Sequence, residues 1–262
     1  IAIEMIEVAS QYADIIKFQK RNNKELLSEK EYNTPHPVSY NSYGKTYGEH
    51  REFLEFDIDQ HKELKNECEK RNKIYSCSAW DLTSAEELTK MNLKMIKIPS
   101  ACNLNQSLLN YIFDNFKGEI HISMGMTKED EIDKIFELAK KKKRSNNTVF
   151  YACTSPSPAD HDQLYLKEIT KYINKYGSEI LCVGFSGHHS GIAPDIAAIT
   201  LGAKYVERHF TLNRTWKGTD HAASLEPDGL RLLGRNMGSV ESSLINKPSD
   251  LLKEESEQLK KL

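Results

Sequence analysis

The sequence predicts an α/β fold, a (β/α)8 barrel whose first strand is missing from this chain. Apolar runs typical of strands alternate with segments typical of helices along most of the 262 residues, which indicates a parallel sheet with helices outside. No glycine-rich dinucleotide turn follows a strand, although a doubly wound open sheet remains an alternative. Polar residues gather where the expected strands end, which is where such barrels place their chemistry.

Seven strands are expected, at 14–19, 74–79, 95–98, 119–123, 148–152, 181–185 and 204–210. Helices are expected at 1–13, 59–72, 84–91, 106–113, 127–143, 165–176, 192–201 and 228–244. We expect Asp59 to cap the second of these helices and Ser84 to open a capping box at the third. An eighth strand would precede the first helix, so we interpret the chain as beginning inside a barrel.

Two segments do not follow the alternation. Residues 20–56 are polar and rich in breakers, and so long an irregular connection is usually functional or mobile. Residues 246–262 are charged and have little apolar periodicity. We therefore expect one barrel domain at 1–245, truncated at its N-terminus, and a linker at 246–262.

Composition restricts the possible partners. A net charge of -2 predicts no broad attraction to nucleic acid or to anionic membranes. The basic run 140–144 has no interleaved aromatic residues and is typical of a solvated helix end. No apolar run reaches the ~20 residues of a membrane span, and the first residues show no signal-peptide pattern. The five cysteines lie mostly in or beside apolar strands, which favours reduced thiols and a cytoplasmic protein.

Two histidines are candidate metal ligands. The segment 181–210 is typical of a strand–helix–strand unit, which places two parallel strands side by side. His188 follows the first of these strands and His209 ends the second. Two neutral imidazoles can hold a divalent ion and leave positions open for water and substrate oxygens. The spacing alone also fits two unrelated histidines.

Lysines and hydroxyl groups collect at the other strand ends. The residues at these positions are Lys17, Ser78, Asp81, Lys97, Ser100, Ser123, Gly125, Thr154, Ser155 and Ser186. Two lysines among several hydroxyls predict an anionic ligand such as a phosphate or a carboxylate. Lys97 lies between two isoleucines, where its ammonium group needs partners. Any one of these serines alone would be explained as a loop or capping residue. Serines at nearly every strand end together indicate a single binding site at the mouth of the barrel.

Several motifs occur in order along nearly the whole chain: IIKFQK, GKTYGEHREFLEF, YSCSAWD, IKIPS, ISMGM, ACTS, GFSGHHSGIA, GAKYVERHFTL and TWKGTDHAASLEP. With these motifs the chain resembles the sialic acid synthases, most closely the animal type that makes N-acetylneuraminate 9-phosphate. The resemblance implies a (β/α)8 barrel followed by a small antifreeze-like (SAF) domain, with residues 246–262 as the linker toward that domain, which is absent here. It also implies a homodimer when the protein is full length.

The resemblance implies a reaction and its residues. Phosphoenolpyruvate would condense with an N-acylmannosamine, or with its 6-phosphate, to give N-acetylneuraminate or its 9-phosphate plus phosphate. Residues matching the phosphoenolpyruvate site are Lys17, Ser78, Lys97, Ser100, Ser123 and Ser186, and from its place at a strand end we add Ser155 as a substrate-binding residue. His188 and His209 match ligands of Mn²⁺ or Mg²⁺, and Asp220 matches a residue near the sugar and the metal-bound water. We expect His188, His209, Asp220 and Lys97 to be catalytic.

Three departures from the family pattern concern the sugar half of the site. Cys102 stands where the family has an acidic residue, and Ser157 stands where it has a tyrosine. The segment IPSAC replaces a glycine-bounded turn. These departures keep two alternatives open: a legionaminate- or pseudaminate-type synthase that uses another N-acyl hexosamine, and a non-catalytic barrel that binds a metal or a sugar phosphate.

Overall fold

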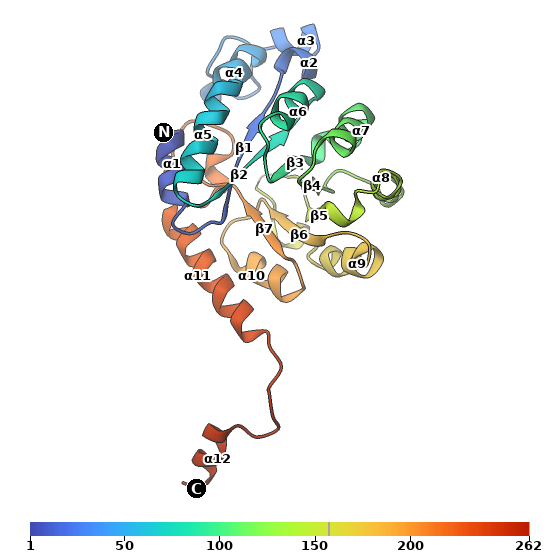
Figure 1. Cartoon of the computed structure of the whole chain (residues 1–262). Coiled ribbons are helices and arrows are strands. Elements are labelled where there is room, and N and C mark those ends of the chain that lie inside the picture. The colour runs from blue at the N-terminus through green and yellow to red at the C-terminus, as the bar shows by residue number, and fades with distance from the viewer. Residues whose placement is uncertain (157, 262) are drawn as a thin grey trace.

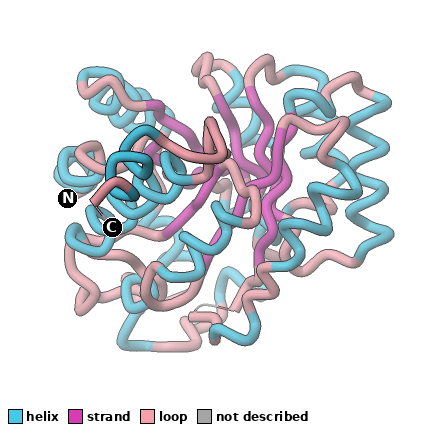
Figure 2. Tube along the Cα trace, turned by 90° about the horizontal axis from the view of Figure 1, so that it is seen from below, coloured by secondary structure: helices cyan, strands magenta, loops and turns pink. Residues whose placement is uncertain are grey.

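The computed structural model describes residues 1–156 and 158–261, and within them seven parallel strands form one sheet in the order of the sequence. The strands are β1 (Ile15–Lys20), β2 (Ile74–Ala79), β3 (Met95–Ile98), β4 (Glu119–Ser123), β5 (Thr148–Cys153), β6 (Cys182–Gly187) and β7 (Tyr205–Arg208). Figure 1 shows them following one another with the helices outside, and Figure 2 shows the same arrangement from below. The predicted barrel-type α/β fold is confirmed.

Helices cover the outer face of the sheet. They are α1 (Ala2–Ala9), α5 (Ile58–Lys70), α6 (Leu82–Thr89), α7 (Gln106–Asn115), α8 (Glu129–Lys141), α9 (Lys167–Tyr176), α10 (Ala193–Thr200) and α11 (Pro227–Ser243). In α8, Ile132, Ile135 and Phe136 are buried, whereas the first turn is acidic and the last turn basic. Such a helix is stabilised by burial of one face and by charges that complement its dipole.

Two of the expected helix caps are wrong. Asp57, not Asp59, caps α5, since its carboxylate accepts hydrogen bonds from the backbone N–H groups of Asp59 and Gln60. Asp81 caps α6 and accepts from the backbone N–H of Ser84 at 2.7 Å. Asp57 and Asp81 have the extended backbone that a cap needs, whereas Asp59 and Ser84 lie inside the first turn of their helices.

The segment 20–56 is more regular than the sequence indicates. It contains α2 (Asn23–Leu26), α3 (Glu29–Asn33), the 3-10 helix η1 (Ser39–Asn41) and α4 (Tyr47–Leu54). Capping boxes begin α3, between Ser28 and Glu31, and α4, between Thr46 and Glu49. These helices are short and mostly exposed, so they lack the apolar period that marks a longer helix.

A further helix, α12 (Lys253–Leu259), lies in the segment that we expect to be a linker. The Glu255 carboxylate accepts a hydrogen bond from the backbone N–H of Leu252 at 2.8 Å and so begins the helix. Most side chains from residue 246 onward are exposed, and Figure 1 shows α12 standing away from the barrel.

The barrel is open along a seam, by which we mean the gap between β1 and β7. In the described residues, β1 forms a ladder with β2 and β7 with β6, and no ladder joins β1 to β7. A cavity of about 1230 Å³ runs along the seam, and Met5 of α1 and Leu230 of α11 line its outer side. The seam leaves the seven-stranded sheet open, with β1 and β7 as its two edges.

Two further features concern expectations from composition. All five cysteines are free thiols, as the sequence predicts. Of the helices described, none combines the length and the apolar character needed to cross a bilayer.

Candidate functional site

The centre of the site is the carboxylate of Glu207 in β7. Its Oε2 lies 3.0 Å from Nζ of Lys97 and 3.5 Å from Nζ of Lys17. The hydroxyl of Ser186 donates to the other carboxylate oxygen at 3.1 Å, and Lys17 donates to Oγ of Ser78 at 3.1 Å. Four residues that the sequence places at different strand ends therefore meet around one acidic group.

Opposite charges set the protonation of this centre. Burial alone would raise the pKa of Glu207, but Lys17 and Lys97 hold that pKa far below its usual range. Burial lowers the pKa of Lys97 to about 8, although Glu207 acts in the opposite direction. At neutral pH the centre thus holds two cations and one anion, and its net positive charge suits an anionic ligand.

The Lys97 ammonium group rests on an aromatic ring. Its Nζ lies 3.4 Å from the ring centroid of Tyr151, which is a cation–π contact inside the barrel. The Tyr151 hydroxyl lies 2.8 Å from Nδ1 of His121, and Nε2 of His121 lies 3.1 Å from Glu119. A Cβ at Gly184 would lie 2.7 Å from the Tyr151 ring, so glycine makes room for the ring here.

Two of the predicted serines flank one glycine. The backbone N–H of Gly125 donates to Oγ of Ser100 at 3.1 Å. A Cβ at Gly125 would lie 2.5 Å from Oγ of Ser155 and 2.7 Å from Oγ of Ser100. The Ser155 hydroxyl is buried and has no partner in the described part of the chain, and Ser123 is buried where β4 ends. The structure thus gathers Ser100 and Ser155 but shows no contact from them to the lysines.

The two histidines predicted as metal ligands are neighbours. The ring centroids of His188 and His209 lie 5.3 Å apart. Nδ1 of His188 lies 3.1 Å from the carbonyl oxygen of Thr154, which can only accept, so Nδ1 carries a proton. Interaction with Cys153 raises the pKa of His188, whereas a metal ion needs the neutral ring. Burial lowers the pKa of His209, which favours the neutral imidazole that metals bind.

Few other side chains near the two histidines could serve as metal ligands. Among residues 1–156 and 158–261, no three or more histidine, cysteine or acidic side chains are placed to hold a metal ion together. Asp220 is exposed and directly precedes the 3-10 helix η5 (His221–Ala223). Its negative charge acts to raise the pKa of His209, against the effect of burial. The residues present fit a cation that takes two imidazoles and completes its shell with water and substrate oxygens.

Sequence reasoning missed two residues of this site. Glu207 lies in a strand beside Val206. A charged residue in an apolar strand needs a partner, and this argument, which we applied to Lys97, would also have identified Glu207. Cys153 ends β5. Burial alone would raise the pKa of the Cys153 thiol, but interaction with His188 leaves that pKa below its usual range. Nothing in the sequence near Cys153 indicates this contact.

The structure describes two of the three departures from the family pattern. Cys102 is buried, and burial raises its pKa to about 11, so it remains a neutral thiol at neutral pH. Pro99 precedes the 3-10 helix η2 (Ser100–Cys102), which forms the last three residues of the IPSAC segment. Ser157 lies outside the described residues.

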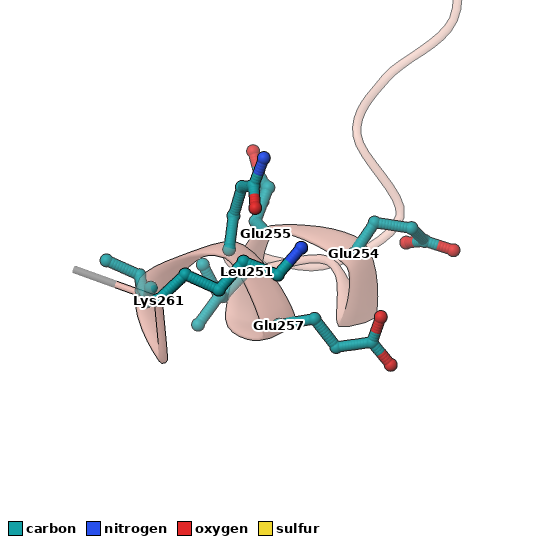
Figure 3. A pocket seen from close by; sticks show the side chains of 7 residues that line it. Leu251, Glu254, Glu255, Glu257 and Lys261 are labelled. Carbon is teal, nitrogen blue, oxygen red and sulfur yellow. The ribbon is translucent and has the colours of Figure 1, made fainter.

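A second hollow lies against α12, far along the chain from these residues. Figure 3 shows its lining side chains, which include Leu251, Glu254 and Glu257. One short helix and the turn before it form this hollow, and it contains none of the predicted site residues. We therefore assign the chemistry to the mouth of the barrel.

A parallel barrel with lysines, hydroxyls and two histidines at the carboxyl ends of its strands defines a class of enzymes that act on anionic substrates. A family model described as the NeuB family matches residues 5–248. The chain therefore belongs to the NeuB family. It is an enzyme, a phosphoenolpyruvate-condensing transferase that makes a nonulosonic acid.

Two curated relatives and one solved structure illustrate the likeness. The chain is 36% identical to the human N-acetylneuraminate-9-phosphate synthase over 96% of its own length and 69% of that protein. It is 32% identical to the N,N'-diacetyllegionaminic acid synthase of Campylobacter jejuni over 93% of its length and 72% of that protein. The crystal structure of N-acetylneuraminic acid synthetase from Leptospira borgpetersenii superposes with a TM-score of 0.82 at 25% identity, covering 99% of this chain and 85% of that one.

Proposed function

We propose that this chain condenses phosphoenolpyruvate with an open-chain N-acylmannosamine, or with its 6-phosphate, to give N-acetylneuraminate, or its 9-phosphate, plus phosphate. The observation that carries the proposal is the convergence of Lys17, Lys97 and Ser186 on one barrel mouth, beside the paired histidines. The 36% identity to the human synthase supports this product.

The lysines and hydroxyls hold phosphoenolpyruvate in this account. Lys17 and Lys97 bind its phosphate and carboxylate, and hydroxyls of Ser78 and Ser186 orient it beside them. Ser100, Ser123 and Ser155 complete the substrate-binding set that the strand ends predict. Because Lys97 is 2% exposed, its charge acts on the substrate in surroundings that largely exclude water.

The second substrate reacts beside the histidines. His188 and His209 would hold Mn²⁺ or Mg²⁺, which when bound supplies polarisation of the acceptor aldehyde. C3 of phosphoenolpyruvate forms a bond to the aldehyde carbon, whose oxygen takes up a proton and becomes a hydroxyl. A water molecule adds to C2 and gives up a proton, which Asp220 would accept as the base. The C2–O bond to phosphate then breaks, and the C2 hydroxyl loses its proton as the ketone forms.

A second candidate differs only in the acceptor sugar. The 32% identity to a legionaminic acid synthase and the thiol of Cys102 favour an N-acyl hexosamine other than N-acetylmannosamine. Cys102 stays a neutral thiol and cannot accept hydrogen bonds from a sugar as a carboxylate does. In this reading the phosphoenolpyruvate half of the site is unchanged.

Phosphate release tests the proposed function. The protein is incubated with Mn²⁺, phosphoenolpyruvate and, in separate reactions, N-acetylmannosamine, its 6-phosphate and bacillosamine-type sugars. Release with N-acetylmannosamine or its 6-phosphate supports the first proposal, and release with a bacillosamine-type sugar alone supports the second. Release with none of these acceptors would contradict both.

The oligomeric state and the cellular location are part of the same proposal. We infer a homodimer for the full-length protein from the family resemblance, with residues 246–262 as the linker toward a C-terminal domain, and sedimentation velocity tests this. The five free thiols support a cytoplasmic setting.

A further inference from the structure

A buried ion pair lies on the outer face of β7. Nη1 of Arg208 in β7 lies 2.5 Å from Oδ2 of Asp195, which lies in the first turn of α10. The side chains of Arg208 and Asp195 are 3% and 0% exposed. His189 completes the cluster, since its Nε2 lies 3.1 Å from Nη1 of Arg208 and 3.2 Å from Oδ2 of Asp195. We call these three residues the Asp195 clamp, and none of them has a role in the proposed reaction.

The clamp also holds the turn that follows β6. The Arg208 guanidinium donates to the backbone carbonyl oxygen of His189 and, at 2.8 Å, to that of Gly191. Both residues belong to the connection between β6 and α10, which begins with His188. One side chain of β7 therefore fixes the path of the backbone directly after His188.

The clamp lies beside both candidate metal ligands. The ladder between β6 and β7 ends at the pair formed by Gly187 and Arg208. The residue after Gly187 is His188, and the residue after Arg208 is His209. The rings of these two histidines lie 5.3 Å apart. Their separation thus depends on how the ends of β6 and β7 are held together.

Strand geometry links the clamp to the inner face of the barrel. Neighbouring residues of a strand face opposite sides, so an Arg208 side chain anchored outside directs Glu207 and His209 inward. The contacts agree, because Glu207 pairs with Lys97 inside the barrel, whereas Arg208 pairs with α10 outside it. In the described part of the chain, β7 has four residues and its ladder joins only β6. An edge strand this short has few backbone contacts that could fix its end.

Stability alone does not account for the clamp. Taking an ion pair out of water is costly, and apolar side chains of similar size often stabilise a fold as well or better. Oδ1 of Asp195, Nε of Arg208 and Nδ1 of His189 are buried and lack a partner within the described residues, which adds to that cost. So costly a pair favours a role in fixing geometry over a role in stability.

We propose that Asp195 is a positioning residue that acts through Arg208: it fixes the two paired histidines and so sets the affinity of the site for a divalent cation. The inference rests on the proposed function, in which His188 and His209 hold Mn²⁺ or Mg²⁺. Groups that orient metal ligands typically change metal affinity by about 10- to 100-fold when they are removed. Asp195 lies in α10, outside the barrel, and acts only by placing the ligands.

The test measures Mn²⁺ binding without substrates. Asp195→Asn removes the charge that anchors Arg208 and keeps the shape of the side chain. Calorimetric titration with Mn²⁺, at a temperature where circular dichroism shows the variant folded, should give a dissociation constant about tenfold or more above that of wild type. Arg208→Lys keeps a charge for Asp195 but loses the fork that reaches two backbone carbonyls, so it should also bind Mn²⁺ more weakly. It replaces Asp195→Asn if that variant does not fold.

Arg144→Lys is the matched control. Arg144 likewise donates to two backbone carbonyl oxygens, those of Phe116 and Gly118. These contacts lie before β4 and β5 begin, at the opposite end of the strands from the histidines. Arg144→Lys should lower the thermal midpoint and leave the dissociation constant for Mn²⁺ unchanged. It therefore separates positioning from a general loss of stability.

Two results of the titrations would overturn the clamp. One is an unchanged dissociation constant for Mn²⁺ in the folded clamp variant. The other is equal weakening in Arg144→Lys, because weaker binding would then follow from any loss of stability. Weaker binding in the clamp variants alone supports it. If the clamp variants weaken Mn²⁺ binding but wild type turns over no acceptor, the proposed function fails while the clamp stands.

A readout without metal covers the remaining case. Crystal structures of metal-free wild type and of the folded clamp variant give the separation of the His188 and His209 rings, which is 5.3 Å here. We expect the rings to move apart in the variant. If wild type binds no Mn²⁺, the metal assignment fails and this separation decides: rings that move apart support the clamp as a positioning device, and rings that stay in place overturn it.

Discussion

Lys97 carries its charge in the interior of the barrel, with a side chain that is 2% exposed, whereas the side chains of Lys17 and Glu207 beside it are 25% exposed. A buried lysine keeps its proton only where an anion lies beside it. Glu207 is that anion in this chain, and we expect the phosphate or carboxylate of a bound substrate to take the same role. The acidic residue is therefore expected to set the pH range over which Lys97 binds a substrate.

Glu207→Gln should shift the pH profile toward acid. The wild-type kcat/KM for phosphoenolpyruvate is expected to fall as pH rises through about 8, where Lys97 loses its proton. Removing the negative charge destabilises the ammonium form, so the pKa of Lys97 falls and the basic limb moves to lower pH. Steady-state kinetics between pH 6 and 10 measure this shift, with Glu67→Gln on α5 as control. A basic limb that stayed in place would contradict the pairing.

The ring of Tyr151 is expected to position Lys97. Tyr151→Phe keeps the ring beneath the ammonium group, whereas Tyr151→Leu removes it. We expect a loss in kcat/KM for phosphoenolpyruvate of about tenfold or more in the leucine variant, and of less than about threefold in the phenylalanine variant. The basic limb should also move to lower pH only in the leucine variant. Equal losses in both would show that the ring merely fills space.

His209→Ala should abolish metal-dependent turnover and leave the fold intact. Removing one of two imidazoles takes half of the protein's ligands from the proposed metal. Turnover with Mn²⁺ and the thermal shift produced by Mn²⁺ alone are both measured, and both should be lost. His161→Ala, a change at an exposed histidine, should retain both. Full activity in His209→Ala would show that the metal assignment is wrong.

Sequence alone predicts much of this site at the residue scale because polar side chains at the ends of parallel strands share one edge. It predicts Lys17, Ser78, Lys97 and Ser186, which the structure joins in one network. It cannot predict that Tyr151 lies under Lys97, because that contact depends on the register and stagger of two strands that are not neighbours.

At the scale of elements, Asp57 and Asp59 lie two residues apart at the start of α5, but only Asp57 caps the helix. Asp57→Ala removes the oxygen that accepts from two backbone N–H groups, and should lower the free energy of unfolding by ~1 kcal/mol. Asp59→Ala removes only an exposed ion pair with Lys62, and should have a much smaller effect. Urea unfolding of both variants measures the difference. Equal destabilisation would contradict the cap.

The elements differ in how well sequence predicts them. The strands at 74–79, 95–98 and 119–123 have the predicted bounds, because each is a short, mostly buried segment with apolar residues at alternate positions between two helices. The helices between 23 and 54 were not predicted, since capping boxes and local contacts hold them rather than an apolar face. Helix α12 escapes prediction for the same reason: it buries no residue.

At the scale of the whole molecule, the site joins the two edges of the open barrel. Lys17 belongs to β1 and Glu207 to β7, so their ion pair crosses the seam that no backbone ladder closes. Sequence predicts the seven strands that the structure shows, in the same order. It cannot predict that a side-chain pair links the two edges across the gap.

The central claim is that the mouth of this barrel binds phosphoenolpyruvate through its buried lysines. Calorimetric titration of the protein with phosphoenolpyruvate, in wild type and in Lys97→Met, tests it most directly. The account predicts one site per chain in wild type and at least about tenfold weaker binding in Lys97→Met, because the buried ammonium is lost. Equal affinity in the two proteins would contradict the account and would place the phosphoenolpyruvate site elsewhere.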